Sequence, residues 1–113
     1  VLTSLDDRDL RDININKSPM EQVKSLALMT KEAGLDGVVA SPKEISAIRE
    51  AMGQDFIIVT PGVRPTWAAV GDQKRIMTPA QAFDAGASYI VVGRPVTAAS
   101  DPVAALDKLF CDV

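Results

Sequence analysis

The feature that most constrains the fold is a fourfold alternation of short apolar runs with segments that carry helix signals. The apolar runs cover residues 1–3, 37–40, 56–60 and 89–92. Each run is almost continuously apolar rather than alternating, which is typical of parallel strands covered on both faces. We therefore predict an α/β fold in which four parallel strands alternate with helices through right-handed crossovers.

Helix start signals lie between the apolar runs. Ser18-Pro19-Met20-Glu21 supplies an N-cap serine, a proline in the first turn and a glutamate three residues after the cap, which are the parts of a capping box. Ser41-Pro42-Lys43-Glu44 and Thr78-Pro79-Ala80-Gln81 repeat this arrangement. Asp101-Pro102 begins a further helix, and residues 6–12 are expected to form a short acidic helical turn.

Helix stop signals and apolar stripes complete the pattern. Glycines that can take a left-handed conformation follow the last periodic positions, at Gly34, Gly53 and Gly86. The apolar positions recur at helical spacing, and we expect each stripe to pack against the sheet. In the last helix this stripe consists of Val103, Leu106, Leu109 and Phe110.

Composition excludes several classes of function. The 113 residues include 12 Lys+Arg, 15 Asp+Glu and no His, which gives a net charge of −3 and excludes His-dependent catalysis or metal binding within the chain. The mild acidity argues against a nucleic-acid partner, and no apolar run is long enough for a membrane span. The single cysteine, Cys111, cannot form an internal disulfide and fits a reducing compartment, so we expect a cytoplasmic protein.

Two architectures are compatible with this alternation. One is an open doubly wound sheet, and the other is half of an eightfold (β/α) barrel. A whole barrel takes about 250 residues, and four strands alone cannot close one. The length and the absence of an initiator Met favour a fragment of a barrel, at most one domain.

A glycine and an arginine follow each of the last two apolar runs. Gly62 and Arg64 come after the third run, and Gly93 and Arg94 come after the fourth. Ligands of parallel α/β folds bind at the carboxyl ends of strands, and in barrels the last two loops commonly bind phosphate. We therefore predict an anion site there, and the alternative is a pair of surface turns with solvated arginines.

Two other segments carry polar groups at the same end. The long connection 61–78 contains Gly71-Asp72-Gln73-Lys74-Arg75, which is either a lid over the anion or a solvated loop tip. Thr3 and Ser4 follow the first run, where their hydroxyls either bind a ligand amide or, in the case of Ser4, cap the helical turn 6–12. Trp67 in the long connection is expected to pack against the rim of the barrel rather than to anchor a lid.

Five segments in this order resemble orotidine 5'-monophosphate decarboxylase, and bacterial members of that family most closely. They cover nearly the whole chain. They are Leu2-Thr3-Ser4, residues 34–39, residues 60–65, residues 71–79 and residues 91–97.

The resemblance implies a (β/α)8 TIM barrel that converts orotidine 5'-phosphate to uridine 5'-phosphate (UMP) and CO2 in de novo pyrimidine biosynthesis. It implies a carbon–carbon lyase that needs no metal or organic cofactor and forms a homodimer. Carried over by motif, Thr3 contacts the pyrimidine or its surroundings, and Gln73 bridges the phosphate and the base. Arg94 binds the phosphate beside the backbone N–H of Gly93, and Arg64 adds a further phosphate-side contact.

The family's catalytic Asp-x-Lys-x-x-Asp motif does not occur in these residues. We therefore expect no catalytic residue here: residues 1–113 form the carboxyl-terminal half of a single barrel domain, the amino-terminal half is absent, and this half alone is inactive. Two alternatives stay open. One is another phosphosugar decarboxylase on a related ribulose-phosphate-binding barrel, and the other is a non-catalytic half-barrel that associates with itself.

Overall fold

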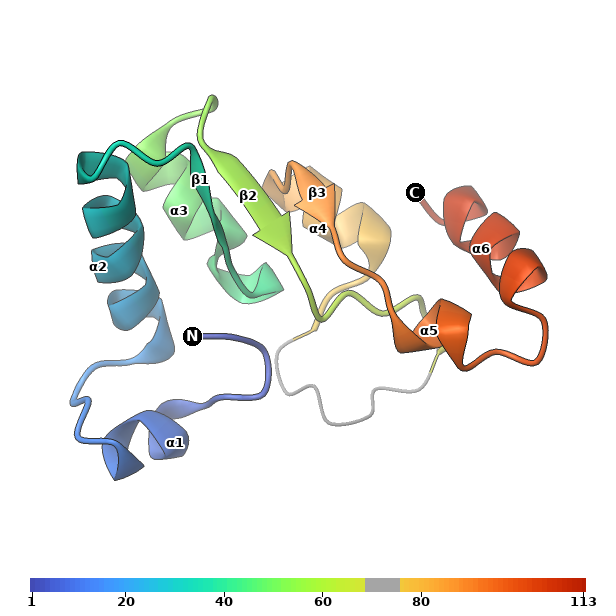
Figure 1. Ribbon diagram of the computed structural model, residues 1–113, viewed down its shortest axis with the longest axis horizontal. Coiled ribbons are helices and arrows are strands. Elements are labelled where there is room, and N and C mark those ends of the chain that lie inside the picture. The colour runs from blue at the N-terminus through green and yellow to red at the C-terminus, as the bar shows by residue number, and fades with distance from the viewer. Residues whose placement is uncertain (69–75) are drawn as a thin grey trace.

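The computed structural model describes residues 1–68 and 76–113, with helices packed behind a small parallel sheet (Figure 1). Helices and strands alternate along most of the chain, as predicted. In chain order the elements are α1 (Asp7–Asp12), α2 (Pro19–Glu32), β1 (Gly37–Val39), the 3-10 turn η1 (Pro42–Glu44), α3 (Ile45–Met52), β2 (Ile57–Thr60), α4 (Pro79–Ala85), β3 (Tyr89–Ile90), α5 (Arg94–Thr97) and α6 (Pro102–Cys111).

The sheet that the described residues form has the order β1-β2-β3, and both neighbouring pairs are parallel. The prediction of a fourth strand at residues 1–3 is wrong. The carbonyl of Leu2 accepts a hydrogen bond from the N–H of Leu5 at 3.1 Å, so the backbone turns there instead of joining a ladder. Val1 still packs against the hydrophobic core, which keeps this segment beside the sheet.

The predicted helix starts are confirmed at three of the four proline motifs. Ser18 and Thr78 form complete capping boxes with Glu21 and Gln81, and Asp101 caps α6. Ser41 does not cap a helix through its side chain. The N–H of Glu44 bonds to the backbone carbonyl of Ser41 at 3.1 Å, which forms a 3-10 turn and delays α3 by three residues.

One arginine, Arg49, binds several backbone carbonyls at the amino-terminal end of the sheet. Arg49 donates from Nη1 to the carbonyls of Gly53, Gln54 and Phe56, and from Nε and Nη2 to the carbonyl of Gly86. These carbonyls belong to the segments that lead into β2 and β3. The guanidinium therefore ties the entries of these two adjacent strands together.

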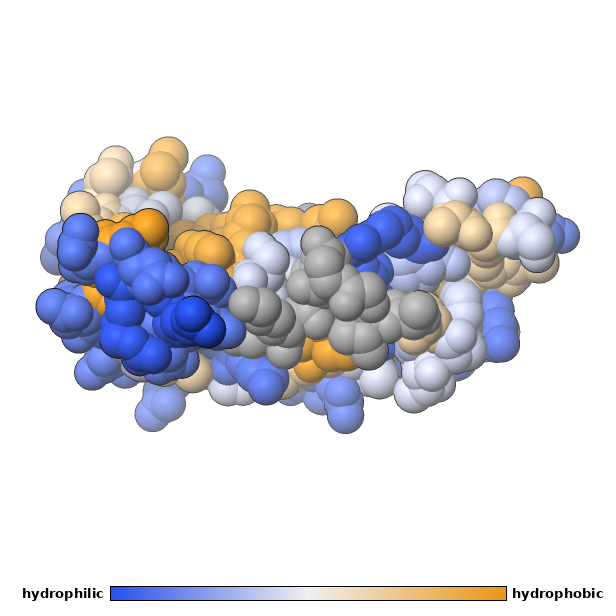
Figure 2. Space-filling model, turned by 90° about the horizontal axis from the view of Figure 1, so that it is seen from below, coloured by the Kyte–Doolittle hydropathy of each residue, from blue (hydrophilic) through white to orange (hydrophobic). Residues whose placement is uncertain are grey.

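The continuously apolar runs predict a sheet that is covered on both faces. In the described structure, helices cover only one face. Val39, Tyr89 and Val91 are at least half exposed, at 58%, 63% and 50%. Val39 and Tyr89 both pair with Val59, so these side chains form one row across the uncovered face. Hydrophobic residues lie along the upper side of the central part in Figure 2, between the hydrophilic α1 and the arm that ends in α6.

The last helix stands apart from the core. The predicted apolar stripe of α6 is only partly packed: Leu109 is buried, whereas Val103 and Phe110 are 72% and 69% exposed. The radius of gyration is 14.8 Å, above the roughly 13 Å of a compact domain of about 100 residues. The described structure is therefore open rather than compact. In a separate respect, no helix of the described residues is both long and apolar enough to cross a bilayer.

Candidate anion-binding site

The loop after β2 begins with a tight contact to the start of the chain. Gly62 has φ +74°, and a Cβ atom built on it would lie 2.3 Å from Cγ2 of Thr3. Only glycine therefore fits both the conformation and the space at this position. Thr3 is 4% exposed and sits at the carboxyl end of β2, the end at which the sequence placed it.

The backbone next to Arg64 is fixed by the far end of the same connection. The N–H of Arg64 donates to the carbonyl of Met77 at 2.9 Å, and Val63 forms an isolated parallel bridge with Met77. Val63 is fully buried and belongs to the hydrophobic core, so the bridge anchors the partly buried Met77 to the core. The base of the connection is thereby closed, and Arg64 leaves the core from a fixed position.

Arg94 follows β3 and is the first residue of the short helix α5. Gly93 is the N-cap, and its carbonyl accepts from the N–H groups of Val96 and Thr97 at 2.9 Å. No atom of the described residues lies within 4 Å of the position of a Cβ on Gly93, so the glycine leaves its backbone open to an approaching group. The sequence did not predict α5, which is too short to show a helical period.

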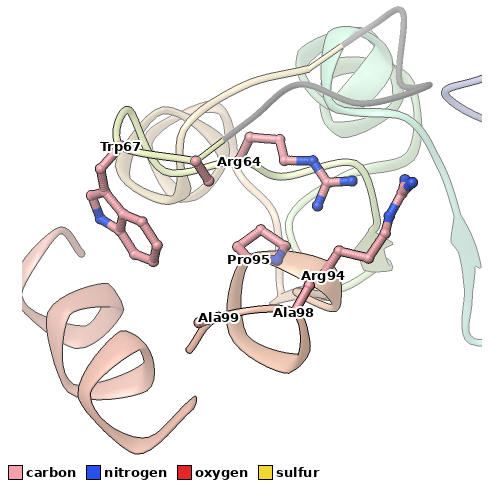
Figure 3. A pocket seen from close by; sticks show the side chains of 7 residues that line it. Arg64, Trp67, Arg94, Pro95, Ala98 and Ala99 are labelled. Atoms are coloured by element: carbon pink, nitrogen blue, oxygen red, sulfur yellow. The ribbon is translucent and has the colours of Figure 1, made fainter. Parts of the chain in front are cut away.

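Arg64 and Arg94 line the same pocket, although 30 residues separate them in the chain. Figure 3 shows both guanidinium groups extending to the same side, past the ring of Pro95. The pocket has a volume of about 310 Å³, and Trp67 stands at its other end. Its lining residues are Arg64, Trp67, Ala68, Arg94, Pro95, Ala98 and Ala99.

The two arginines differ in their exposure to solvent. Arg64 is only 7% exposed, whereas Arg94 lies on the surface. A charge in a poorly solvated position acts through a lower effective dielectric than one in water. The pocket therefore offers an anion one shielded and one accessible guanidinium, each a rigid fork of donors suited to phosphate or carboxylate oxygens.

The structure brings together four of the five predicted site residues at the carboxyl ends of β2 and β3. Thr3 contacts Gly62, two residues before Arg64, while Gly93 directly precedes Arg94. Gln73 and the predicted lid tip around it lie outside the described residues. The described part of the chain contains no group of three side chains able to hold a metal ion.

Sequence reasoning missed two buried hydroxyls at the same edge of the sheet. Ser41 follows β1 and Thr60 ends β2, and both are fully buried with no hydrogen-bond partner for the side-chain oxygen among the described residues. A buried hydroxyl without a partner costs about 1–3 kcal/mol. The signal for both is a polar residue directly after an apolar run. The alternative that Ser4 caps the first helix is wrong, because Asp6 is its N-cap.

Comparison with known proteins identifies the family to which this chain belongs. The sequence profile of the orotidine 5'-phosphate decarboxylase / HUMPS family matches residues 1–109. The chain belongs to this family.

Two curated relatives are orotidine 5'-phosphate decarboxylases. The chain is 59% identical over 114 aligned residues to the protein of Moorella thermoacetica, covering 100% of the chain and 45% of the relative. It is 57% identical over 109 residues to that of Pseudoalteromonas atlantica, covering 96% of the chain and 47% of the relative. The chain thus spans about half the length of the curated relatives it matches.

Solved structures of orotidine 5'-phosphate decarboxylases agree with the fold. The enzyme of Lactobacillus acidophilus superimposes with a TM-score of 0.78 at 44% identity, over 99% of this chain and 46% of the other. That of Pyrococcus horikoshii gives a TM-score of 0.63 at 26% identity, over 81% of this chain and 41% of the other. The prediction of a partial (β/α)8 barrel is confirmed, and the uncovered face of the sheet is the face that a complete barrel encloses.

Proposed function

We propose that residues 1–113 form the carboxyl-terminal half of a single (β/α)8 domain of orotidine 5'-phosphate decarboxylase, an enzyme of pyrimidine biosynthesis that yields UMP and CO2. In this proposal the chain supplies the phosphate-binding side of the site. The observation that carries it is the shared pocket of Arg64 and Arg94 at the ends of two adjacent strands.

Each candidate residue has a distinct role in this proposal. Arg94 and the backbone N–H of Gly93 bind the phosphate from β3, and Arg64 binds it from β2. Thr3 lies beside Gly62 and faces the pyrimidine side. Gln73 reaches both the phosphate and the base from the connection between β2 and α4.

The proposed chemistry divides between the two halves of the domain. A decarboxylation that leaves a carbanion needs an acid that delivers a proton to the same carbon, and the family's Asp-x-Lys-x-x-Asp motif is not in this sequence. The phosphate is remote from that carbon, and binding energy from a remote group lowers the barrier when it is used to hold the reacting group in place. The 113 residues therefore bind and orient, without metal or organic cofactor, and do not themselves transfer the proton.

We also propose that the full-length protein is a cytoplasmic homodimer. The support is the family membership, the single cysteine and the similarity to bacterial relatives. Size-exclusion chromatography with light scattering of the full-length protein tests the dimer. A monomer at micromolar concentration would contradict it.

The experiment for the binding role compares UMP with uridine, which differ only in the phosphate. Calorimetric titration of the 113-residue chain should give saturable binding of UMP and none of uridine. Replacing Arg94 by Gln should weaken UMP binding at least about tenfold, since a charge-assisted contact is worth roughly 1.5–3 kcal/mol. Equal binding of UMP and uridine would contradict this role. Release of CO2 from orotidine 5'-phosphate by this chain alone would instead contradict the proposed division of the chemistry between the two halves.

A phosphosugar substrate, as in a related ribulose-phosphate-binding barrel, is the alternative. Both substrates share the phosphate, and they differ in what surrounds it. The same titration with ribulose 5-phosphate separates them. Preference for the pentose phosphate over UMP would support the alternative.

A further inference from the structure

Trp67, the only tryptophan in the sequence, joins the loop after β2 to the end of α6. Its indole Nε1 donates to Oδ2 of Asp112 at 2.9 Å. The ammonium of Lys108 lies 4.8 Å from the centroid of the same ring, within the range of a cation–π contact. Lys108 and Asp112 are four residues apart, so they present one face of the helix end to the indole.

This contact lies on the loop that carries the proposed phosphate ligand. Trp67 comes three residues after Arg64, and the N–H of Ala68 closes a turn onto the carbonyl of Pro65 at 3.0 Å. At the start of this segment, the backbone N–H of Arg64 donates to the carbonyl of Met77. The segment 64–68 is therefore held at one end by the core and at the other by α6.

The opposite wall of the pocket belongs to the chain that leads into α6. Arg94, Pro95, Ala98 and Ala99 line that wall, and Trp67 stands across from them (Figure 3). Because α5 is followed directly by α6, the tie to Trp67 connects the two walls through the helix. The separation of Arg64 from Arg94 then depends on whether Trp67 stays on Asp112 and Lys108.

We propose that Trp67 is a positioning residue of the anion pocket, held by Asp112 and Lys108 so that Arg64 stays at the spacing from Arg94 that a phosphate requires. The proposal rests on the proposed function, since it takes the phosphate of a nucleotide as the ligand. Holding two binding groups in place before the ligand arrives raises affinity by lowering the ordering cost of binding.

The test uses two substitutions of the same kind on one helix. Asp112→Ala removes the acceptor of the indole N–H, while Asp107→Ala removes an equally exposed carboxylate of α6. Both remove one negative charge from the chain. Electrostatics alone would therefore tighten phosphate binding slightly in both variants, whereas loss of the tie weakens it in Asp112→Ala only.

Three measurements on the intact chain follow each variant: hydrogen exchange of the amides of Arg64 and of residues 66–68, the emission maximum of Trp67, and the affinity for UMP with uridine as reference. For Asp112→Ala we expect faster exchange, a red-shifted emission and UMP binding weakened about two- to tenfold. Lys108→Met should act in the same direction by about two- to fivefold, as expected for one exposed cation–π contact. Asp107→Ala should leave exchange and emission unchanged.

Each outcome decides the proposal. Unchanged exchange in both Asp112→Ala and Lys108→Met overturns it, and so does faster exchange with unaltered UMP affinity. If the unaltered chain binds no UMP, the proposed function fails for this chain. Exchange alone then decides whether Trp67 orders segment 64–68, with acceleration in Asp112→Ala and not in Asp107→Ala supporting it and any other result overturning it.

Discussion

Thr3 packs directly on Gly62, and the space between them has no room for a methyl group: a Cβ on Gly62 would be 2.3 Å from Cγ2 and 2.9 Å from Cβ of Thr3. The start of the chain is thus fitted against the turn that leads to Arg64. Residues at the two ends of a 59-residue separation share one edge of the candidate site.

Gly62→Ala should therefore destabilise the fold by about 2–4 kcal/mol, which combines a strained left-handed conformation with overpacking. Gly34→Ala is the matched control, because Gly34 also has a positive φ of +85°, but a Cβ there would have no atom of the residues in ranges 1–68 and 76–113 within 4 Å. Chemical denaturation should show the larger loss for Gly62. Equal losses would mean that the contact with Thr3 contributes nothing.

Arg49→Lys should lower the stability by about 2 kcal/mol. A lysine keeps the charge, but its single ammonium cannot reach the four carbonyls that the forked guanidinium binds. Arg8→Lys makes the same exchange at an exposed position of α1 and should change the stability by less than about 0.5 kcal/mol. Thermal unfolding followed by circular dichroism compares the two variants. Equal transition temperatures would contradict the stabilising role of the Arg49 hydrogen bonds.

The stability of the first turn of α2 should depend on pH through the carboxyl group of Glu21. Hydrogen bonds from the backbone N–H of Ser18, and secondly from its hydroxyl, lower the pKa of the Glu21 carboxyl below its ordinary value. A carboxyl whose pKa is lower in the folded state stabilises the fold above its unfolded pKa, and this contribution disappears as the pH falls through the folded pKa. Exchange of the first amides of α2 should therefore accelerate on acidification.

Two comparisons check the effect at Glu21. Glu21→Gln keeps an oxygen acceptor without a titrating group, so it should remove this part of the pH dependence. The box at α4 already contains a glutamine, with Thr78 N–H bonded to Oε1 of Gln81 at 3.0 Å, and should be insensitive to acid over the same range. An NMR titration that gives Glu21 an ordinary pKa would refute the prediction.

Arg64 and Arg94 should contribute to UMP binding non-additively. Because both line one pocket, removing either guanidinium leaves the phosphate in a changed position for the other. In a double-mutant cycle with Arg64→Gln and Arg94→Gln, we expect a coupling energy above about 0.5 kcal/mol, as found for residues that share a partner. Additive losses, measured by calorimetry, would place the two arginines on separate ligands.

Much of the fold follows from local signals in the sequence. Ser18, Thr78 and Asp101 begin helices because cap hydrogen bonds are made within four residues, and a four-residue pattern shows them. Ser41 carries the same pattern but begins a 3-10 turn, since its backbone carbonyl rather than its hydroxyl takes the Glu44 amide. The four-residue pattern does not contain the information on which of these two oxygens accepts the hydrogen bond.

The sequence predicts which arginines belong to the candidate site, but it does not predict the long-range contacts that shape the pocket around them. Arg64 and Arg94 lie within four residues of the ends of two apolar runs, so the tendency of ligands to bind at strand ends places them together. Trp67 contacts Asp112 across 45 residues, and no periodicity connects these positions. The sequence also could not predict that Val103 and Phe110 are exposed. An apolar stripe predicts that a helix face will be covered, but it does not show which segment covers it.

The bridge between Val63 and Met77, together with the Arg64–Met77 hydrogen bond, joins the two ends of the connection between β2 and α4. Because the buried Val63 anchors this junction to the core, a change of length in the connection beyond Ala68 need not move the strands, and it adds only about 0.6 kcal/mol of closure entropy for each doubling. Evolution can therefore exchange the intervening residues, and with them the groups offered to a ligand, without having to rebuild the scaffold.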